Sequence, residues 1–391
     1  MAALKLAVVA GEPSGDILGA ELVRQIAIQT GEHPELTGVG GERLIAEGLV
    51  SLFDYTELSI IGFSAVIAKL PKLIMRIRQT AEAIIAAKPD CLLIIDSPDF
   101  SHRVARKVRR ALPDLKIINY VCPTVWAWKP ERAPAMRAYV DHVLSIFPFE
   151  PEIVKALGGP PLTYVGHRLM NDPGLIAAHQ AQKARRQDPA APDGPKGPPM
   201  CLLLPGSRGG EVSRLGPAFG EAARRLAAIN PAMTFVLPAG AHVERQIRDE
   251  VLGWDVACRI VTGDAAKWQS FGEADVAIAA SGTVLLELAL AGVPHMSCYK
   301  VDLISRLLIH MVTTWTAALP NMIAGHVVIS EAYDNHVRPE RVAREAQQLA
   351  QNTAHRAAML ADFDLVWSRM QTGEPASELA ARTVLSVIAE K

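Results

Sequence analysis

The chain of 391 residues is about two and a half times as long as a typical domain, which favours two domains. Half of the residues are hydrophobic, 21% are charged and 5% are aromatic, a composition that excludes intrinsic disorder, collagen and coiled coils. Lys and Arg number 40 against 41 Asp and Glu, so the formal charge is -1. A duplex-binding protein would carry a basic excess, so no nucleic-acid partner is expected.

The cysteines and the apolar runs indicate a cytoplasmic protein. The five cysteines are Cys91, Cys122, Cys201, Cys258 and Cys298. They show no C-x-x-C spacing and several lie in apolar runs, which is typical of small core residues in a reducing compartment. No stretch reaches the roughly 18 consecutive apolar residues of a membrane span. The first residues pass from a short apolar run to Gly and Glu, which predicts a strand rather than a signal peptide.

Short apolar runs alternate along the chain with longer helical stretches. The runs are 4–10, 91–96, 116–121, 142–147, 162–166, 200–206, 233–239, 259–263, 276–281 and 294–299. Runs that are apolar throughout are typical of parallel strands covered on both faces. Their alternation with helices predicts an α/β protein with two Rossmann-like doubly wound domains, facing each other across a cleft.

The boundary between the domains is expected where Pro and Gly concentrate. The twelve residues 188–199 hold five Pro and two Gly, which is incompatible with a helix or a central strand. The expected parts are an N-terminal domain at 1–170, a linker at 171–199, a C-terminal domain at 200–365 and a helical tail at 366–391. The tail either caps the second domain or crosses back to the first.

The segment 58–78 combines apolar residues with a basic flank. Residues 58–68 carry no charge, and the next ten interleave Leu, Ile and Met with Lys69, Lys72, Arg76 and Arg78. A half-inserted surface helix on an anionic bilayer has this pattern. An amphipathic helix packed on its own domain has it too.

Ligands of open α/β sheets bind beyond the carboxyl ends of the strands, so the residues that follow each run are candidates for a site. The first run ends in AGEPSGD, where two glycines allow a tight turn and Ser14 or Asp16 can cap the next helix. This is not the dinucleotide motif G-x-G-x-x-G. Glu12 and Asp16 disfavour a phosphate and suit the hydroxyls of a sugar, with an acid-capped helix start as the alternative.

Two further turns of the first half carry candidate groups. Asp96 and Asp99 follow a strand, and an Asp in a partly apolar turn can act as a general base toward an alcohol, worth roughly 10²–10⁴-fold. Alternatively, Asp96 binds turn amides or caps a helix. Trp126 and Trp128 follow the next strand, where they either offer an aromatic surface to sugar rings or acyl chains or plug the core.

Two strand ends of the second half can bind a nucleotide. Gly206, Ser207 and Arg208 precede a helix, and an Arg fork beside a helix N-terminus matches a diphosphate. A second set consists of Ser281, Gly282, Thr283 and Glu287. The first three offer hydroxyls and amides at a helix start, and the carboxylate one turn further is placed to hold two ribose hydroxyls. The turns suited to a diphosphate thus lie in the second half, and the carboxylate-rich turns lie in the first half. This difference predicts a nucleotide-diphosphate donor in the second domain and an acceptor in the first.

Signals for a metal or a serine nucleophile are weak. The motif Asp362–Asp364 lies in the helical tail, far from any strand end, and the 11 His show neither H-E-x-x-H nor Cys/His spacing. A G-x-S-x-G elbow is absent from the sequence. We therefore expect no metal and no other cofactor.

Together these motifs resemble the lipid A disaccharide synthase family, glycosyltransferases of the two-Rossmann-domain (GT-B) class. The resemblance rests on AGEPSGDILGA (10–20), IDSPDF (95–100), PTVWAW (123–128), YVGHRL (164–169), LPGSRGGEV (204–212), ASGTVLLELAL (280–290) and LPNMIAG (319–325). The chain departs from the family pattern at Pro13, where Ala is common, and at Ser101, where Asn is common. The stretches 188–199 and 330–391 match poorly.

The resemblance implies transfer of 2,3-diacylglucosamine from its UDP derivative to the 6-hydroxyl of 2,3-diacylglucosamine 1-phosphate. The β-1,6 product requires inversion at an α-linked donor, and so a base on the acceptor and stabilisation of the departing UDP. Asp99 is the implied base, by match to the family's PDF aspartate. Glu12 and Asp90 match other acidic positions, and Asp90 is expected to be structural because it precedes its strand. Asp96, Asp99 and Glu12 all remain candidates for the base.

The resemblance also assigns the donor side and the surroundings. Arg208 would meet the diphosphate together with residues 281–283, Glu287 would hold the ribose, and Asn321 would complete the donor site. Because both substrates carry acyl chains, segment 58–78 is expected to contact the inner face of the inner membrane. A homodimer is compatible with this pattern. The alternatives are a UDP-sugar 2-epimerase of the same fold and a non-catalytic protein that binds sugar nucleotides or lipids.

Overall fold

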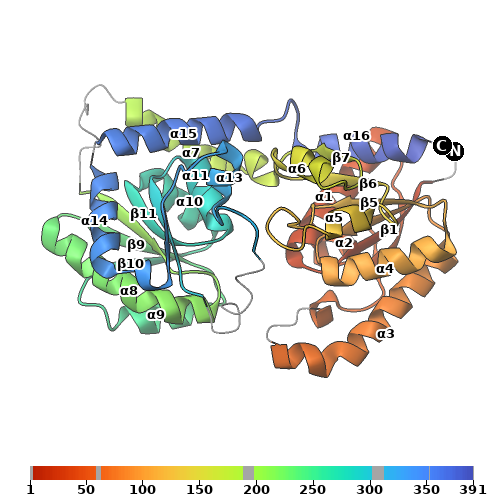
Figure 1. Ribbon diagram of the computed structural model, residues 1–391, viewed down its shortest axis with the longest axis horizontal. Helices are drawn as coiled ribbons and strands as arrows, with labels where there is room; N and C mark the ends of the chain where they lie inside the picture. The colour runs from red at the N-terminus through yellow and green to blue at the C-terminus, as the bar shows by residue number, and fades with distance from the viewer. Residues whose placement is uncertain (1–2, 59–62, 188–197, 302–311, 352, 391) are drawn as a thin grey trace. The chain divides into compact units, whose positions relative to one another are not determined.

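The computed structural model describes residues 3–58, 63–187, 198–301, 312–351 and 353–390, with the backbone alone for 63–69. The chain forms two compact units, Met1–Arg168 with Thr372–Lys391, and Leu169–Gln371. Each unit is a parallel sheet with helices on both faces (Figure 1). The predicted doubly wound α/β architecture is therefore confirmed.

The sheet of the first unit has the strand order β3-β2-β1-β4-β5-β6-β7. Its strands are β1 (Lys5–Ala10), β2 (Glu35–Val39), β3 (Val50–Ser51), β4 (Cys91–Ile95), β5 (Lys116–Tyr120), β6 (His142–Ser145) and β7 (Leu162–Tyr164). The order reverses between β1 and β4, which pair in parallel with Val9 opposite Ile94. Such a reversal is a topological switch point, where the loops after two neighbouring strands diverge and leave room for a ligand.

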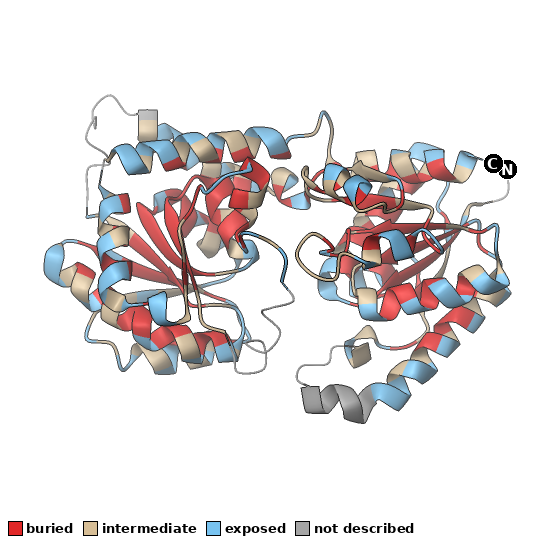
Figure 2. Ribbon diagram, viewed as in Figure 1, coloured by how far each residue is buried: buried red, intermediate tan, exposed pale blue. Residues whose placement is uncertain are grey.

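Helices cover both faces of this sheet. They are α1 (Pro13–Thr30), α2 (Glu42–Ala46), the 3₁₀ helix η1 (Tyr55–Leu58), α3 (Phe63–Ala87), α4 (Pro98–Ala111), α5 (Arg132–Met136), α6 (Glu150–Ala156) and α16 (Ala376–Ala389). Side chains alternate along β4, so Leu93 packs in the layer formed with α1 and α16, and Ile94 in the layer formed with α3 and α4. Figure 2 shows the buried residues concentrated on the sheet between these layers.

The sheet of the second unit has the order β10-β9-β8-β11-β12-β13 and reverses between β8 and β11. Its strands are β8 (Met200–Leu204), β9 (Thr234–Ala239), β10 (Cys258–Thr262), β11 (Val276–Ala280), β12 (His295–Tyr299) and β13 (Glu331–Tyr333). Its helical segments are η2 (Arg168–Asn171), α7 (Pro173–Gln187), α8 (Gly209–Ile229), α9 (Glu244–Val251), α10 (Asp264–Glu273), α11 (Thr283–Ala291), α13 (Leu319–Ala324), η4 (Asp334–His336), α14 (Pro339–Ala350) and α15 (Ala354–Met370). The first residue of η2 belongs to the first unit.

The chain passes from one unit to the other at positions that differ from the expected domain boundaries. Helix α7 packs on α10 and α11, and Gln182 Nε2 donates to the carbonyls of Phe271 and Ala274, both at 2.7 Å. Residues 173–187 therefore belong to the second unit and not to a linker, while 188–197 lie outside the described residues. The tail divides at 371, because α15 packs in the second unit and α16 packs on α1, where Gln29 Nε2 donates to the Glu378 carbonyl at 2.9 Å.

Helix α3 is amphipathic, and three apolar side chains in its first half are exposed. Ile77 is buried in the core of the first unit. In the preceding turns Leu70, Ile74 and Met75 are 41%, 54% and 52% exposed. The first part of segment 58–78 lies outside the described side chains. In the ranges that the structure does describe, none of the helices has the length and apolarity to span a membrane.

Candidate active site

A pocket of about 620 Å³ lies at the switch point of the second unit, beyond the carboxyl ends of β8 and β11. It is lined by the predicted residues Gly206, Ser207, Arg208, Ser281, Gly282, Thr283 and Glu287. The two turns predicted to bind a nucleotide, which lie more than 70 residues apart in the chain, therefore face one pocket.

The first turn of this pocket is shaped around the carboxylate of Glu211. The backbone N–H groups of Ser207 and Arg208 donate to its Oε2 at 3.1 and 3.2 Å, and Arg208 Nη1 donates to its Oε1 at 3.1 Å. Gly206 has φ 122°, and a Cβ there would lie 2.5 Å from Glu211 Oε2, so only glycine fits. The side chain of Arg208 is 79% exposed, so the guanidinium is available to an anion in the pocket.

The second turn opens helix α11 toward the same pocket. Gly282, the residue before the helix, is exposed and has φ 149°. The first amides of a helix lack acceptors within the helix and lie at the positive end of its dipole. Together with Arg208 on the facing turn, this helix start gives the pocket two features that favour an anion.

Glu287 is paired with a lysine that the sequence motifs did not identify. Lys267 Nζ lies 3.2 Å from Glu287 Oε2 and 4.0 Å from the centroid of the Trp268 ring. Burial raises the pKa of Glu287, and Lys267 opposes that shift. Lys267 lies in the first turns of α10, four residues after Gly263 at the end of β10, so a search of the residues after that strand could have found it. The ion pair fixes the carboxylate at the pocket wall.

Asn321 is not part of this pocket, contrary to the expectation from the resemblance. It is fully buried, and its Oδ1 accepts the backbone N–H groups of Val328 and Ile329 at 2.8 and 2.9 Å. Its Nδ2 donates to the carbonyl of Ile329 at 3.1 Å and to Thr316 Oγ1 at 3.2 Å. Because the amide is satisfied by the chain itself, Asn321 anchors the loop before β13.

The switch point of the first unit joins the turns after β1 and β4. Ser14 Oγ donates to Asp96 Oδ2 at 2.9 Å, and the Ser97 N–H donates to Asp96 Oδ1 at 2.9 Å. Asp96 and Ser97 have φ 53° and 48°, a left-handed conformation that costs about 1–3 kcal/mol for each non-glycine residue. Ser101 Oγ donates to the Asp96 carbonyl at 2.8 Å and holds the turn. Asp96 therefore positions the start of α4.

Asp16 has a structural role that the sequence did not indicate, and its contact with substrate stays a prediction. Its buried carboxylate accepts the backbone N–H groups of Gly41, Arg43 and Leu44 at 2.7, 2.9 and 3.1 Å. It thus caps α2, a helix remote from its own in the sequence. Asp90 is structural as expected, because its Oδ2 accepts the Lys5 N–H at 2.8 Å.

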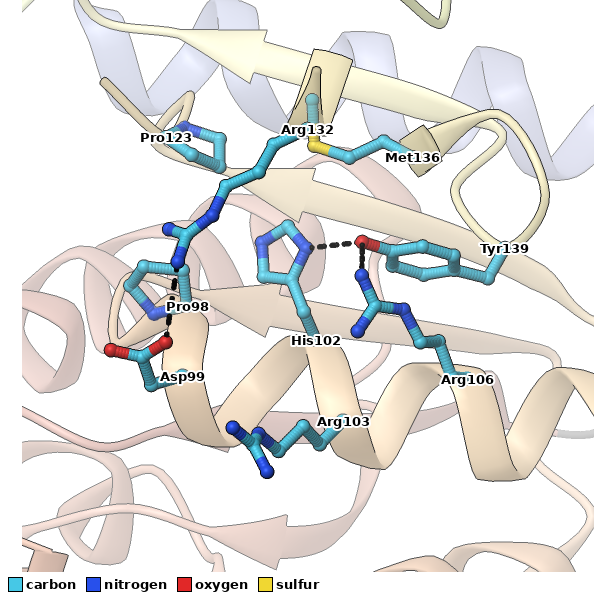
Figure 3. A pocket seen from close by; sticks show the side chains of 9 residues that line it. All are labelled: Pro98, Asp99, His102, Arg103, Arg106, Pro123, Arg132, Met136 and Tyr139. Carbon is cyan, nitrogen blue, oxygen red and sulfur yellow. Dashed lines mark hydrogen bonds and ion pairs between the residues drawn. The ribbon is translucent and has the colours of Figure 1, made fainter. Parts of the chain in front are cut away.

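Two carboxylates at this end of the sheet are exposed. Glu12 is the residue before α1 and makes no side-chain cap for that helix. The Asp99 side chain lies in the first turn of α4 and is 82% exposed, with Arg132 Nη2 at 3.6 Å from Oδ1. Asp99 also lines a cavity of about 210 Å³ together with His102, Arg106 and Tyr139 (Figure 3). The start of α4 therefore presents a carboxylate that is accessible from solvent.

Trp126 is packed into a cluster and is not an open aromatic platform. Its Nε1 donates to Glu150 Oε1 at 3.1 Å, and its ring lies edge-on to Phe149 with centroids 5.3 Å apart. Burial raises the pKa of Glu150 to about 7. The core-plug alternative therefore describes Trp126 better than the substrate-binding one.

No group of three or more His, Cys, Asp or Glu side chains in the described ranges is arranged to hold a metal ion. The five cysteines are free thiols, and four of them are buried.

Solved structures with two Rossmann-like domains share this fold. A glycotransferase of kitacinnamycin has a TM-score of 0.62 at 14% identity, covering 99% of this chain and 100% of that one. The UDP-GlcNAc 2-epimerase of Neisseria meningitidis, solved with UDP-GlcNAc bound, has a TM-score of 0.58 at 12% identity, covering 99% and 100%. The fold and the pocket at the second switch point thus define a two-Rossmann-domain protein of the GT-B class.

The sequence comparisons narrow this class to one family. The sequence model of the family described as Lipid-A-disaccharide synthetase matches residues 6–381. The lipid-A-disaccharide synthase of Rhodopseudomonas palustris strain CGA009 is 43% identical over 382 residues, covering 97% of this chain and 95% of the relative. That of Ruegeria pomeroyi is 40% identical over 392 residues, covering 98% and 95%. The chain belongs to the lipid-A-disaccharide synthase family, and the resemblance drawn from its motifs is confirmed.

Proposed function

We propose that the chain is an inverting glycosyltransferase that moves 2,3-diacylglucosamine from UDP to the 6-hydroxyl of 2,3-diacylglucosamine 1-phosphate. The observation that carries the proposal is the pocket of the second unit, where Arg208, the start of α11 and Glu287 converge. These groups match a diphosphate and a ribose, and the chain belongs to a family named for this synthesis.

The second unit binds the donor. Arg208 and the amides at the start of α11 hold the diphosphate, and the two oxygens of Glu287 accept the ribose hydroxyls. Lys267 pairs with that carboxylate, orients it and opposes the rise of its pKa on burial. As the sugar leaves, negative charge grows on the departing UDP, and Arg208 with the helix amides stabilises it. Removing one such donor costs about 3–4 kcal/mol in comparable oxyanion sites.

The first unit binds the acceptor and supplies the base. Inversion by a single displacement needs a carboxylate that takes the proton of the attacking 6-hydroxyl. Asp99 suits this role because it is exposed at a strand end of the switch point. Asp96 is engaged by Ser14 and Ser97 and supports the turn, and Glu12 remains a second exposed carboxylate nearby in the fold.

The exposed side chains of helix α3 support the proposal that the protein contacts an anionic bilayer, at the inner face of the inner membrane. Its exposed apolar residues Leu70, Ile74 and Met75 are flanked by Lys72 and Arg78, whose side chains are exposed. Such a face inserts at the headgroup boundary while the cations bind anionic lipids. Both substrates carry acyl chains, so a surface of this kind would give access to them.

Product analysis tests the proposal. Purified protein is incubated with UDP-2,3-diacylglucosamine and 2,3-diacylglucosamine 1-phosphate, and the lipids are analysed by mass spectrometry. We expect a disaccharide 1-phosphate and one UDP per disaccharide. An isomerised sugar nucleotide without disaccharide would instead identify an epimerase, and UDP binding without turnover would identify a binding protein.

A further inference from the structure

The cavity beside Asp99 is lined by a cluster of arginines that the proposed chemistry does not use. Asp99, His102, Arg103 and Arg106 follow the spacing i, i+3, i+4 and i+7, so they share one face of α4. Arg132 reaches the cavity from α5 (Figure 3). Three guanidinium groups thus surround a space in which Asp99 is the one lining carboxylate among the described residues.

The imidazole of His102 does not offset or add to this charge. His102 is buried, and burial, with Arg106 and Arg132 nearby, lowers its pKa to about 4. Its Nδ1 lies 3.0 Å from the Tyr139 hydroxyl, which also accepts a hydrogen bond from Arg106 Nη2 at 3.0 Å. Nδ1 is thus engaged with Tyr139, and the other ring nitrogen, Nε2, points away from Tyr139 (Figure 3).

The arginines are held to different degrees. Arg106 stacks on the Tyr139 ring, with its guanidinium carbon 4.5 Å from the centroid, and is fixed in place. Arg132 pairs with Asp99 at 3.6 Å, a long contact. In the described part of the chain Arg103 lines the cavity without an ion pair. A fixed guanidinium and a free one around one space form a receptor for an anion with several oxygens.

We propose that this cavity binds the phosphomonoester of the acceptor, with Arg103 and Arg106 as its principal ligands. The inference rests on the proposed function, because it gives the acceptor's charged end a place beside the base. Arg106 lies seven residues after Asp99, about 10 Å along the helix. The 6-hydroxyl and the 1-phosphate stand at opposite ends of a pyranose ring, so one helix face holds both ends.

Acceptor kinetics with paired substrates test the inference. In neutral detergent micelles, kcat/KM is measured for 2,3-diacylglucosamine 1-phosphate and for the same lipid without its phosphate. We expect Arg103→Gln and Arg106→Gln each to lower kcat/KM for the phosphorylated acceptor about 10- to 100-fold. The values for the unphosphorylated acceptor and the KM for the donor should not change. Arg103→Lys should recover part of the loss.

Arg110→Gln is the matched control, because it removes the same charge from an exposed position of α4 outside the cavity. It should leave both acceptors unaffected. Equal losses on both acceptors, or no loss with either variant, would overturn the inference. The inference would also be overturned if the arginine variants lose binding to phosphatidylglycerol vesicles but still prefer the phosphorylated acceptor. That result would assign the arginines to lipid headgroups. If Arg106→Gln fails to fold, the acceptor kinetics of Arg103→Gln alone test the inference.

Calorimetry separates this inference from the proposed function. Wild-type protein is titrated with glucosamine 1-phosphate and with glucosamine. If Arg103→Gln weakens the binding of glucosamine 1-phosphate at least 10-fold, the result supports the phosphate site in the cavity. This holds even if the wild-type protein makes no disaccharide, in which case the proposed function alone fails. Equal binding of both sugars, with or without Arg103, overturns the cavity even if the transfer proceeds.

Discussion

The hydroxyl of Ser14 donates a hydrogen bond to Oδ2 of Asp96 at 2.9 Å and so ties the turn after β1 to the turn after β4. Asp96 and Ser97 both adopt left-handed backbone conformations, and Ser101 supports them from α4. The strained turn directs the first residues of α4, Asp99 among them, to the end of the sheet. Pre-organisation of this kind is typical of functional sites.

Ser14→Ala should lower stability and acceptor turnover together. Loss of the hydroxyl removes one hydrogen bond to a carboxylate, so we expect the free energy of unfolding to fall by about 1–2 kcal/mol and kcat to fall severalfold. Urea unfolding and steady-state kinetics measure the two effects. Ser14→Thr keeps the hydroxyl and serves as the control; wild-type behaviour of Ser14→Ala would show that the bond does not hold the turn.

Asn321→Ala should destabilise the second unit while UDP binding persists. The substitution leaves the N–H groups of Val328 and Ile329 buried without their acceptor, at a cost of about 3 kcal/mol or more. Thermal unfolding and UDP titration of the folded protein are compared with those of Asn335→Ala, an exposed control. If Asn321→Ala instead loses affinity for UDP with unchanged thermal stability, Asn321 is part of the donor site.

Glu150 should make stability depend on pH. Burial raises the pKa of its carboxyl from 4.5 to about 7, so between these values the folded protein binds more protons than the unfolded chain. Stability should therefore fall as the pH rises from about 4.5 to about 7, by at most about 3 kcal/mol from this group. Glu150→Gln removes the titration while keeping an acceptor for Trp126.

The measurement is the melting temperature of Glu150→Gln minus that of wild type at pH 5 and at pH 8. The difference should be larger at pH 8, where wild type carries a buried charge. A difference that is the same at both pH values would show that Glu150 is not protonated in the folded protein near neutrality.

Ile74→Glu should weaken binding to anionic vesicles without unfolding the protein. The side chain is half-exposed on α3 between Lys72 and Arg78, so a carboxylate there opposes both insertion and attraction to lipid. Flotation with phosphatidylglycerol vesicles measures the effect. Ile28→Glu places the same charge at an exposed apolar position of α1 and should bind like wild type. If wild type, Ile74→Glu and Ile28→Glu bind the vesicles equally, α3 does not contact the membrane.

The strands were largely predictable from the sequence, because buried parallel strands are apolar throughout. Each of the ten apolar runs overlaps a strand of one of the two sheets. Strands β2, β3 and β13 were not predicted. The first, ELTGV, mixes polar residues and glycine, and the other two are short edge strands whose pairing depends on a neighbour already in place.

The site was predictable only where local sequence fixes the geometry. Gly206 and Gly282 permit backbone conformations that create the two turns of the pocket, and such turns leave a local signature. Asp16 and Asn321 stand in motifs of the same appearance, but their partners are amides of other segments, which only the folded chain brings to them. Lys267 was missed because its relation to Glu287 arises from the packing of α10 against α11.

The assignment of Asp99 as the base is tested most directly by turnover and UDP binding of Asp99→Asn. The amide keeps the size of the side chain and cannot take a proton from the acceptor. We predict a loss of kcat of at least 100-fold, within the usual contribution of a general base, with the Kd for UDP unchanged from wild type. Glu12→Gln, measured alongside, should lose less. Near-wild-type turnover of Asp99→Asn would contradict the account and move the base to Glu12 or Asp96.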